Sequence, residues 1–378
     1  MAAADILIQD VGGTLTVGIP RDAVASAEST TFAYGDPYSH FPTFVLEVAT
    51  TTDALNGSPT WQDITAHLEA FTTNRGRVGE GGQARGEAAF TLDDPELDLV
   101  GGNIQPGRRL RLRVTAPTTA TLFDGFIDDP RRVYDRRRGC TWQLRCYDLL
   151  ALLAEDTVTD LANGLGAGEK TGARIGRLLD LAGVPVSMRD INTGLSDCAA
   201  HVASTNQLLP EIQKAVDTES GRVFVSADGK LTFQERYSDP AFFSVAIGDS
   251  TTNSPAAHTV ASGVERVFPR AEVTWSGGTT AAEDTSAVAQ FGRRTRSLTT
   301  LIDNERYAES LAEWTTLRLS SIREYLPTIS IGPFTDLTHA TQLLGLDLFD
   351  RLSVSRRPVG AVSSDTFDVL IEGISFRG

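Results

Sequence analysis

The sequence has 378 residues, of which 41% are apolar and 22% charged, enough apolar material for two or three globular domains. Its formal charge of −15 and its pI of about 4.8 disfavour sequence-specific DNA binding, because an acidic surface repels the phosphate backbone. The odd number of cysteines excludes a simple disulfide framework, and we expect Cys140, Cys146 and Cys198 to be buried free thiols.

Residues 1–5 carry neither a basic region nor an apolar stretch, so the sequence predicts no signal peptide. No apolar run reaches about 18 residues, so it predicts no membrane segment either. We therefore expect a soluble product made in a reducing cytoplasm. Arginine far outnumbers lysine, which occurs only at Lys170, Lys214 and Lys230, and this bias indicates a GC-rich coding genome.

Residues 1–40 are rich in Gly, Ala, Ser and Thr and are interpreted as an N-terminal arm with one short strand at 6–8. Such an arm either reaches a neighbouring subunit or is a loose chain end, and the composition leaves both alternatives open. No repeat with a period of about 20 to 50 residues is visible along the chain, so a solenoid or propeller is not expected.

Residues 41–160 are predicted to form a β domain. Three segments alternate apolar and polar residues, the period of a half-buried strand, and a fourth is a further strand: 44–49, 109–114, 142–147 and 121–127. In the second segment arginines occupy the polar positions, so one face is apolar and the other charged. Several short strands separated by turn signals favour a barrel or sandwich.

The segment 128–138 is predicted to be a polar connection and carries the densest basic run of the sequence. A nucleic-acid site would place aromatic residues among the arginines, and only Tyr134 is there. A hairpin tip or a salt-bridge surface for another subunit is therefore the favoured interpretation. Further along, Asp148 is expected to cap a short apolar helix over 148–154.

Residues 161–262 change to an α+β pattern and are predicted to form a middle domain. Thr171 is expected to cap a helix that stops at Gly183, and a second helix is expected over 206–219. Asp228-Gly229 between two alternating runs predicts a β-hairpin. The Ser-, Thr-, Asn- and Pro-rich stretch 248–262 is interpreted as a linker or long loop.

Residues 263–378 return to a β pattern and are predicted to form a second β domain. Apolar and small residues at steps of three and four predict one long helix over 303–324, with a stripe made of Ala308, Leu311, Thr315, Leu319 and Ile322. Strands are expected within 267–275 and at 328–331, 351–355 and 366–374.

The sequence yields no candidate catalytic, cofactor-binding or metal-ligating residue. No two of the five histidines stand at metal-ligand spacing: His40, His67, His201, His258 and His339. The Gly-rich run 164–171 is not predicted to bind phosphate, because Glu169 separates its last glycine from Lys170. Acidic pairs are frequent in so acidic a chain and are interpreted as solvated surface. We therefore predict that the protein is not an enzyme.

Four groups of segments follow one another along the chain: 61–65 with 71–77, then 86–95 with 107–113, then 122–127, and last 286–294 with the long helix and 344–354. In this order they resemble the tail hub or minor tail protein family of long-tailed siphophages, in particular those that infect actinobacteria. The chain departs from the family at Asp94, where Asn is usual, and at Gln290, where Tyr is usual. None of the segments is a catalytic signature.

The resemblance implies a mainly β fold with two tail-tube-like β-barrel or sandwich domains, at 41–160 and 263–378, and a small α+β domain at 161–262. It further implies that three chains form a ring at the tail tip of the virion, joining the tail tube to the distal tip. The implied partners are other copies of the chain, the distal tail and tail tube proteins, other tail-tip proteins, the tape measure protein, and genomic DNA that passes through the lumen without specific binding.

No cofactor is implied by the resemblance. The negative charge of the chain adds a separate hypothesis, that an acidic lumen reduces sticking of the passing DNA. Two alternatives remain open. A receptor- or carbohydrate-binding tail protein would show aromatic residues clustered on loops, whereas aromatics are 7% of the chain and lie mostly in strand patterns. A cell-wall hydrolase would need a metal cluster, a Cys/His pair or paired acids in a cleft.

Overall fold

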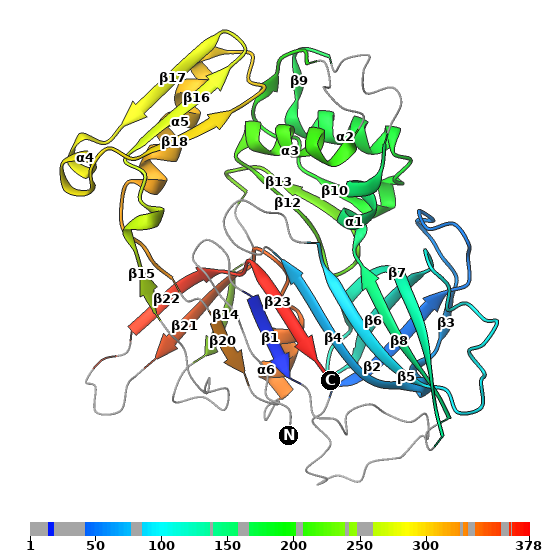
Figure 1. Cartoon of the computed structure of the whole chain (residues 1–378). Coiled ribbons are helices and arrows are strands. Elements are labelled where there is room, and N and C mark those ends of the chain that lie inside the picture. Colours follow the sequence, from blue (N-terminus) through cyan, green and yellow to red (C-terminus); the bar gives the residue numbers. More distant parts are fainter. Residues whose placement is uncertain are drawn as a thin grey trace.

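The fold was examined in a computed structural model (Figure 1), which describes residues 14–18, 42–76, 85–136, 139–157, 166–201, 207–238, 242–247, 260–325, 328–331, 337–356, 363 and 365–378. The predicted strand at 6–8 and most of the predicted linker 248–262 lie outside these residues. Strands predominate over helices in the described part, so the prediction of a mainly β protein with some helices is confirmed.

One ten-stranded sheet organises the molecule. Its strands, in spatial order, are β20 (Thr328–Ile331), β1 (Thr14–Gly18), β23 (Gly373–Arg377), β4 (Leu68–Gly76), β5 (Glu87–Asp93), β8 (Gly139–Tyr147), β7 (Ala120–Asp135), β6 (Arg109–Ala116), β2 (Thr43–Ala49) and β3 (Trp61–Asp63). Figure 1 shows β1 and β23, from the two ends of the chain, side by side. The sheet therefore crosses the predicted division of the chain, because β23 pairs with β4 from Gly373↔Gly76 to Arg377↔Thr72.

The core lies on the apolar face of this sheet. The predicted alternation in β6 is confirmed, since Leu110, Leu112 and Val114 are fully buried. The same apolar cluster continues into the C-terminal part of the chain, where Ile374 and Phe376 of β23 join it. Strands predicted to belong to two separate β domains thus share one core.

Strand β7 is longer than predicted. Segment 128–138 was expected to be a polar connection, which is wrong, because β7 continues to Asp135 and pairs with β8 up to Asp135↔Gly139. Its described pairing with β6 stops at Phe126, so Pro130 lies where β7 has one neighbouring strand and its missing N–H is tolerated. The arginine run therefore lies at the end of a long hairpin, as the hairpin-tip interpretation expected.

The described residues of the middle part form three helices, a short helical turn and five short strands around their own core: α1 (Leu149–Glu155), α2 (Thr171–Leu181), α3 (Leu208–Glu219), η4 (Val186–Met188), β9 (Glu169–Lys170), β10 (Arg189–Ile191), β11 (Asp197–Cys198), β12 (Arg222–Val225) and β13 (Leu231–Gln234). The cap of α1 is confirmed, because the side chain of Asp148 accepts a hydrogen bond from Leu150 N at 3.0 Å. Thr171 does not cap α2: Lys170 holds the cap position, and the Thr171 hydroxyl donates instead to Glu219 at 3.1 Å.

Residues 260–325 form a separate module above the sheet (Figure 1), with β15 (Ala261–Ser262), η5 (Val264–Arg266), β16 (Arg270–Trp275), β17 (Gly278–Glu283), α4 (Thr285–Phe291), β18 (Thr295–Thr299), α5 (Glu305–Leu319) and β19 (Glu324–Tyr325). Its small core includes Val273, Ala308 and Leu311. Helix α5 packs on β16 and β17 and ends at Leu319, before the predicted limit at 324. Ile322 lies after the end of this helix and is exposed.

The remaining elements are η2 (Thr65–His67), β14 (Phe242–Ile247), α6 (Leu337–Leu344), β21 (Arg351–Arg356) and β22 (Asp365–Leu370). The single strand predicted at 366–374 is wrong. It is two strands separated by a bend at Ile371 and Glu372, because β22 pairs with β21 up to Leu370 and β23 pairs with β1 and β4 from Gly373. This bend places β22 beside β21 and β23 in the ten-stranded sheet.

The contribution of β23 to the core can be tested with Phe376→Ala, which removes a ring that is 1% exposed. We expect a loss of about 3–5 kcal/mol in the free energy of unfolding, measured by urea denaturation. Leu317→Ala, at a side chain that is 79% exposed, is the control and should change it by less than about 0.5 kcal/mol. Equal effects of the two substitutions would show that β23 is not part of the core.

Candidate assembly surfaces

The ten-stranded sheet ends in β20 and β3, which each have one strand neighbour within the described residues. Hydrogen bonds to β2 and the residue after it flank β3 on both sides. Thr60 O accepts from Thr50 N at 2.8 Å before the strand, and Ile64 N donates to Leu46 O at 2.9 Å after it. Antiparallel pairing alternates, so the backbone groups of Trp61 and Asp63 point away from β2. An open edge of this kind is a template for a strand from another chain.

A network of charges lies on the sheet face beside this edge. Arg111 and Arg113 both donate to Glu47, at 2.6 and 2.8 Å, and the Arg111 guanidinium lies 4.0 Å from the centre of the Trp61 ring. Burial acts to raise the pKa of Glu47, but the hydrogen bonds from the two arginines outweigh it and the pKa is lowered. The predicted charged face of β6 is thus confirmed as a cross-strand ion-pair network.

The end of the β7–β8 hairpin exposes apolar side chains. Val133 and Tyr134 are 44% and 66% exposed. The adjoining loop packs on the hairpin because Asp94 N donates to Cys140 O at 2.9 Å, and this loop exposes Leu97 and Val100. Exposed apolar side chains gathered in one place are typical of a contact surface.

Asp94 is fully buried and has a structural role. Its carboxylate accepts hydrogen bonds from Trp142 Nε1 at 2.9 Å and from Leu99 N at 3.3 Å. These are two donors for one acceptor group, a requirement that an Asn side-chain oxygen also meets. Asp94, at the position where the resembled family usually has Asn, therefore accepts the two hydrogen bonds that an Asn oxygen could also accept.

The turn of the β12–β13 hairpin packs against the ten-stranded sheet. A Cβ atom on Gly229 would lie 3.0 Å from Arg109 Nη2 and from Asp124 Cγ, and the backbone φ of Gly229 is +73°. Both the close approach and the left-handed backbone require glycine here. The predicted Asp228-Gly229 hairpin is confirmed, and its turn is where the middle part touches the ten-stranded sheet.

Arg109 and Asp124, beneath this turn, form a buried bidentate ion pair with distances of 2.5 and 2.9 Å. Burial raises the pKa of Asp124 to about 6, although the charge and hydrogen bonds of Arg109 lower it. The arginines of β6 were predicted to point outward, and Arg109 differs from the other two because the hairpin turn covers it.

Asp347 joins three parts of the chain. Its Oδ1 accepts from Arg75 Nη1 of β4 at 2.5 Å, and its Oδ2 accepts from Ala227 N in the β12–β13 turn at 2.9 Å. Its own backbone N donates to Asp350 at 2.7 Å. Arg75 is 272 positions away in the sequence and its side chain is 3% exposed, so sequence patterns gave no signal for this pairing.

The three cysteines are buried free thiols, as predicted. Burial raises the pKa of the Cys198 thiol to about 11, so it is not a reactive thiolate at neutral pH. In the Gly-rich run, Glu169 pairs with Arg174 and Arg177, both at 2.5 Å, rather than facing an open phosphate cradle. The run therefore anchors the start of α2.

Among the described residues, no group of three or more His, Cys, Asp or Glu side chains is placed to hold a metal ion. Two histidines have polar partners: a ring nitrogen of His67 lies 2.9 Å from Asp93 O, and His201 lies 3.2 Å from Glu211. In the described part of the chain, no helix is both long enough and apolar enough to span a bilayer.

Three solved structures of tail proteins have a similar fold. They are a 43 kDa tail protein of a Shewanella oneidensis prophage (TM-score 0.56, 12% identity), a tail protein from Neisseria meningitidis (0.54, 12%) and the prophage tail protein gp18 from Listeria monocytogenes (0.52, 13%). Each match covers 88% of this chain, and 94%, 91% and 90% of the respective structures. No family model and no curated protein matches the sequence.

This chain therefore has the fold of phage tail proteins over most of its length. The identities are low, so the likeness establishes the architecture and leaves the role of the chain to be argued. The expectation of a tail-protein fold is confirmed at this level.

Asp347→Ala should destabilise the junction. It leaves the guanidinium of Arg75 buried without this carboxylate and removes the acceptor for Ala227 N, so we expect a loss of about 3–5 kcal/mol in the free energy of unfolding. Urea denaturation measures it. Asp368→Ala is the matched control, because Asp368 is half-exposed and lies 3.8 Å from Arg351. A loss in Asp347→Ala no larger than in this control would contradict the junction.

Asp350 should make stability depend on pH. Burial, together with the charge of Asp347, raises its pKa in the folded chain from 3.8 to about 7, although the hydrogen bond from Asp347 N–H and the charge of Arg75 act to lower it. A raised folded pKa means that the stabilisation from protonated Asp350 is present at acid pH and is lost as pH rises from about 4 through about 7.

Asp350→Asn keeps an acceptor for Asp347 N and removes the titration. Its melting temperature minus that of the wild type should therefore rise between pH 5 and pH 8, values chosen to lie on either side of about 7. Asp368→Asn serves as the control at an exposed position of the same sheet region. A difference that stays constant over this range for Asp350→Asn would exclude the effect.

Proposed function

We propose that the protein is a structural component of a phage tail and acts as a hub at the tail tip. In this proposal three chains form a ring that joins the tail tube to the distal tip, and the chain acts by assembly and not by catalysis. It is made in the host cytoplasm and becomes part of the virion. The arginine bias of the sequence supports a GC-rich host, such as an actinobacterium, and the resemblance of the sequence segments adds a siphophage source.

The observation that carries the proposal is the fold. Three tail proteins match 88% of the chain, and the matches cover at least 90% of each of those structures. A likeness that extends through the sheet, the middle part and the module 260–325 favours a whole protein of similar architecture over a shared small domain. The likeness of the fold supports a tail role. The resemblance of the sequence segments is what supports the hub position.

The sheet edges support the ring. Within the chain, β23 pairs edge to edge with β4 and so joins the C-terminal strands to the strands of the N-terminal half. In the part of the chain that the structure describes, β3 and β20 each have one free edge for the same kind of contact between chains. Head-to-tail contacts of this kind close into a ring when the rotation between copies divides the circle evenly.

The proposed partners are two further copies of the chain, the tail tube and distal tail proteins, other tail-tip proteins and the tape measure protein. Genomic DNA would pass through the lumen without specific binding. The net charge of −15 supports an acidic lumen wall, which would not retain a polyanion.

Two measurements test the proposal. Mass photometry of the purified full chain should show a species of three times the 40.6 kDa chain mass. Electron microscopy of intact particles carrying a tagged copy should place the tag at the distal end of the tail. A tag distributed along the tail or on the capsid would reject the hub assignment.

Asp63→Pro tests the contribution of the β3 edge. The Asp63 N–H points away from β2, so proline should keep the sheet intact and block an incoming strand. We expect monomers in mass photometry and an unchanged circular dichroism spectrum. Asp63→Ala, which keeps the N–H, should still assemble. A trimer of Asp63→Pro would contradict assembly through this edge without bearing on the tail location.

A further inference from the structure

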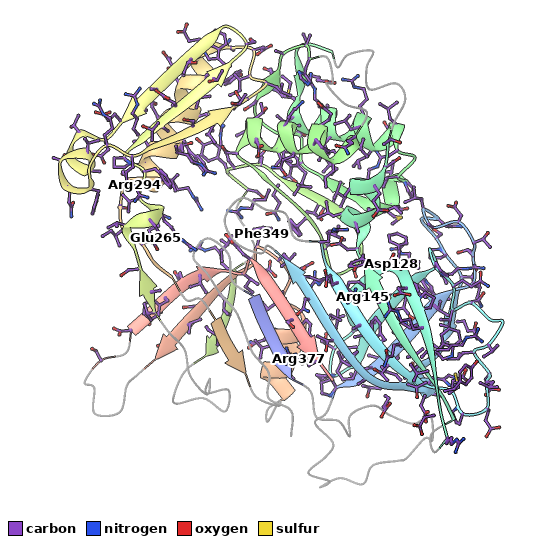
Figure 2. All side chains as sticks on the ribbon, in the orientation of Figure 1. Asp128, Arg145, Glu265, Arg294, Phe349 and Arg377 are labelled. Atoms are coloured by element: carbon purple, nitrogen blue, oxygen red, sulfur yellow. The ribbon has the colours of Figure 1, made fainter. Side chains whose placement is uncertain are left out.

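A cavity of about 600 Å³ lies where the parts of the chain meet. Its walls come from α3 and β12 of the middle part, from β18 and α5 of the module 260–325, and from the segments that carry Phe349 and Glu372. Figure 2 shows Phe349 at this central place. The ring of Phe349 packs on Phe224 at 5.0 Å between centroids, so one wall is rigid and apolar.

The cavity is rich in arginine. Its lining includes five arginines and three acids: Arg222, Arg236, Arg296, Arg318 and Arg323, with Asp148, Asp217 and Glu372. A local excess of positive charge stands out in a chain whose net charge is −15. Arg296, Arg318 and Arg323 are exposed, whereas Arg222 is half-buried and Arg236 buried, so the cationic groups extend from the mouth to the interior.

Arg236 is buried with hydrogen-bond donors to spare. Its side chain is 3% exposed, and its Nε and Nη1 have no hydrogen-bond partner. The nearest carboxylate oxygen, Glu219 Oε1, is 3.9 Å from Nε, beyond hydrogen-bond distance. The other oxygen of Glu219 is used by Thr171, Leu195 and Ser196. Buried donors without acceptors are costly, and a bound anion would supply the acceptors.

Arg222 adds a second cationic group on the same wall. Its guanidinium lies 5.1 Å from the centre of the Phe349 ring. Burial, together with the nearby charge of Arg318, lowers the pKa of Arg222 to about 10, while the charge of Glu372 acts to raise it. A group held this way remains charged at neutral pH and gains from an added negative charge.

Two of the lining acids are already engaged. Asp148 accepts from Gly86 N at 2.6 Å and from Leu150 N at 3.0 Å, and Asp217 accepts from Gln213 at 2.6 Å. These two carboxylates accept hydrogen bonds from backbone and side-chain amide groups. They leave the buried donors of Arg236 unsatisfied.

We propose that this cavity binds a small carboxylate or phosphate anion, held by Arg222 and Arg236. Planar guanidinium groups match both anions with paired hydrogen bonds. Both arginines belong to the middle part, and residues of the module 260–325 and of the C-terminal segment form the other walls of the site. The proposal rests on the cavity alone and does not depend on the role of the chain in a tail.

Isothermal titration calorimetry of the full chain with two probes tests it, inorganic phosphate in one arm and citrate in the other. We expect binding of one anion per chain in at least one arm, and a melting temperature that rises with that anion. The arm with the tighter binding identifies the anion class. Arg236→Gln and Arg222→Gln should each weaken binding about tenfold or more.

Arg293→Gln is the matched control, because Arg293 is exposed, lies outside the cavity lining and pairs with Glu283 at 3.0 Å. Its affinity should stay within about twofold of the wild type. If Arg236→Gln loses its fold by circular dichroism, Arg222→Gln at the half-buried position decides. Absence of binding up to about 10 mM in both arms overturns the proposal. That result is expected if a water molecule between Arg236 and Glu219 satisfies the buried donors instead of an anion. So does equal binding by the cavity variants and the control.

Discussion

The structure depends on strand pairing between segments that are far apart in the chain. Strand β23 lies between β1 and β4, so the last described strand joins the first described strand to the rest of the ten-stranded sheet. Ile374 and Phe376 of β23 are fully buried in the shared core. Without β23, the edge of β4 would be open and one side of the core would be uncovered. Open strand edges favour aggregation. The sheet is therefore complete only when both ends of the chain are in place.

The same dependence recurs where the middle part meets the sheet. The β12–β13 turn lies over the Arg109–Asp124 pair and donates a backbone hydrogen bond to Asp347, which also holds Arg75. The module 260–325 is attached to the middle part through contacts such as Leu301 N to Thr218 Oγ1 at 2.8 Å and Ala199 N to Leu301 O at 2.6 Å. An arginine-lined cavity lies between these parts.

Sequence patterns predicted what is decided locally. The alternation in β2, β6 and β8, the Asp148 cap and the turn at Gly229 follow from neighbours in the chain, and all are confirmed. Non-local contacts decided the rest. Segment 128–135 is a strand because β8 pairs with it, Thr171 binds the distant Glu219 instead of capping, and 366–374 divides between two sheets. The pairing of Arg75 with Asp347 and the cavity arginines likewise come together only in the fold.

The claim that both chain ends complete one cooperative sheet can be measured by native-state hydrogen exchange with mass spectrometry. The account predicts that the amides of β23 that pair with β1 and β4 exchange as slowly as those of β5, because they open only when the whole sheet unfolds. Exchange in β23 about 100-fold faster than in β5 would show a separately opening terminal strand and would contradict the account.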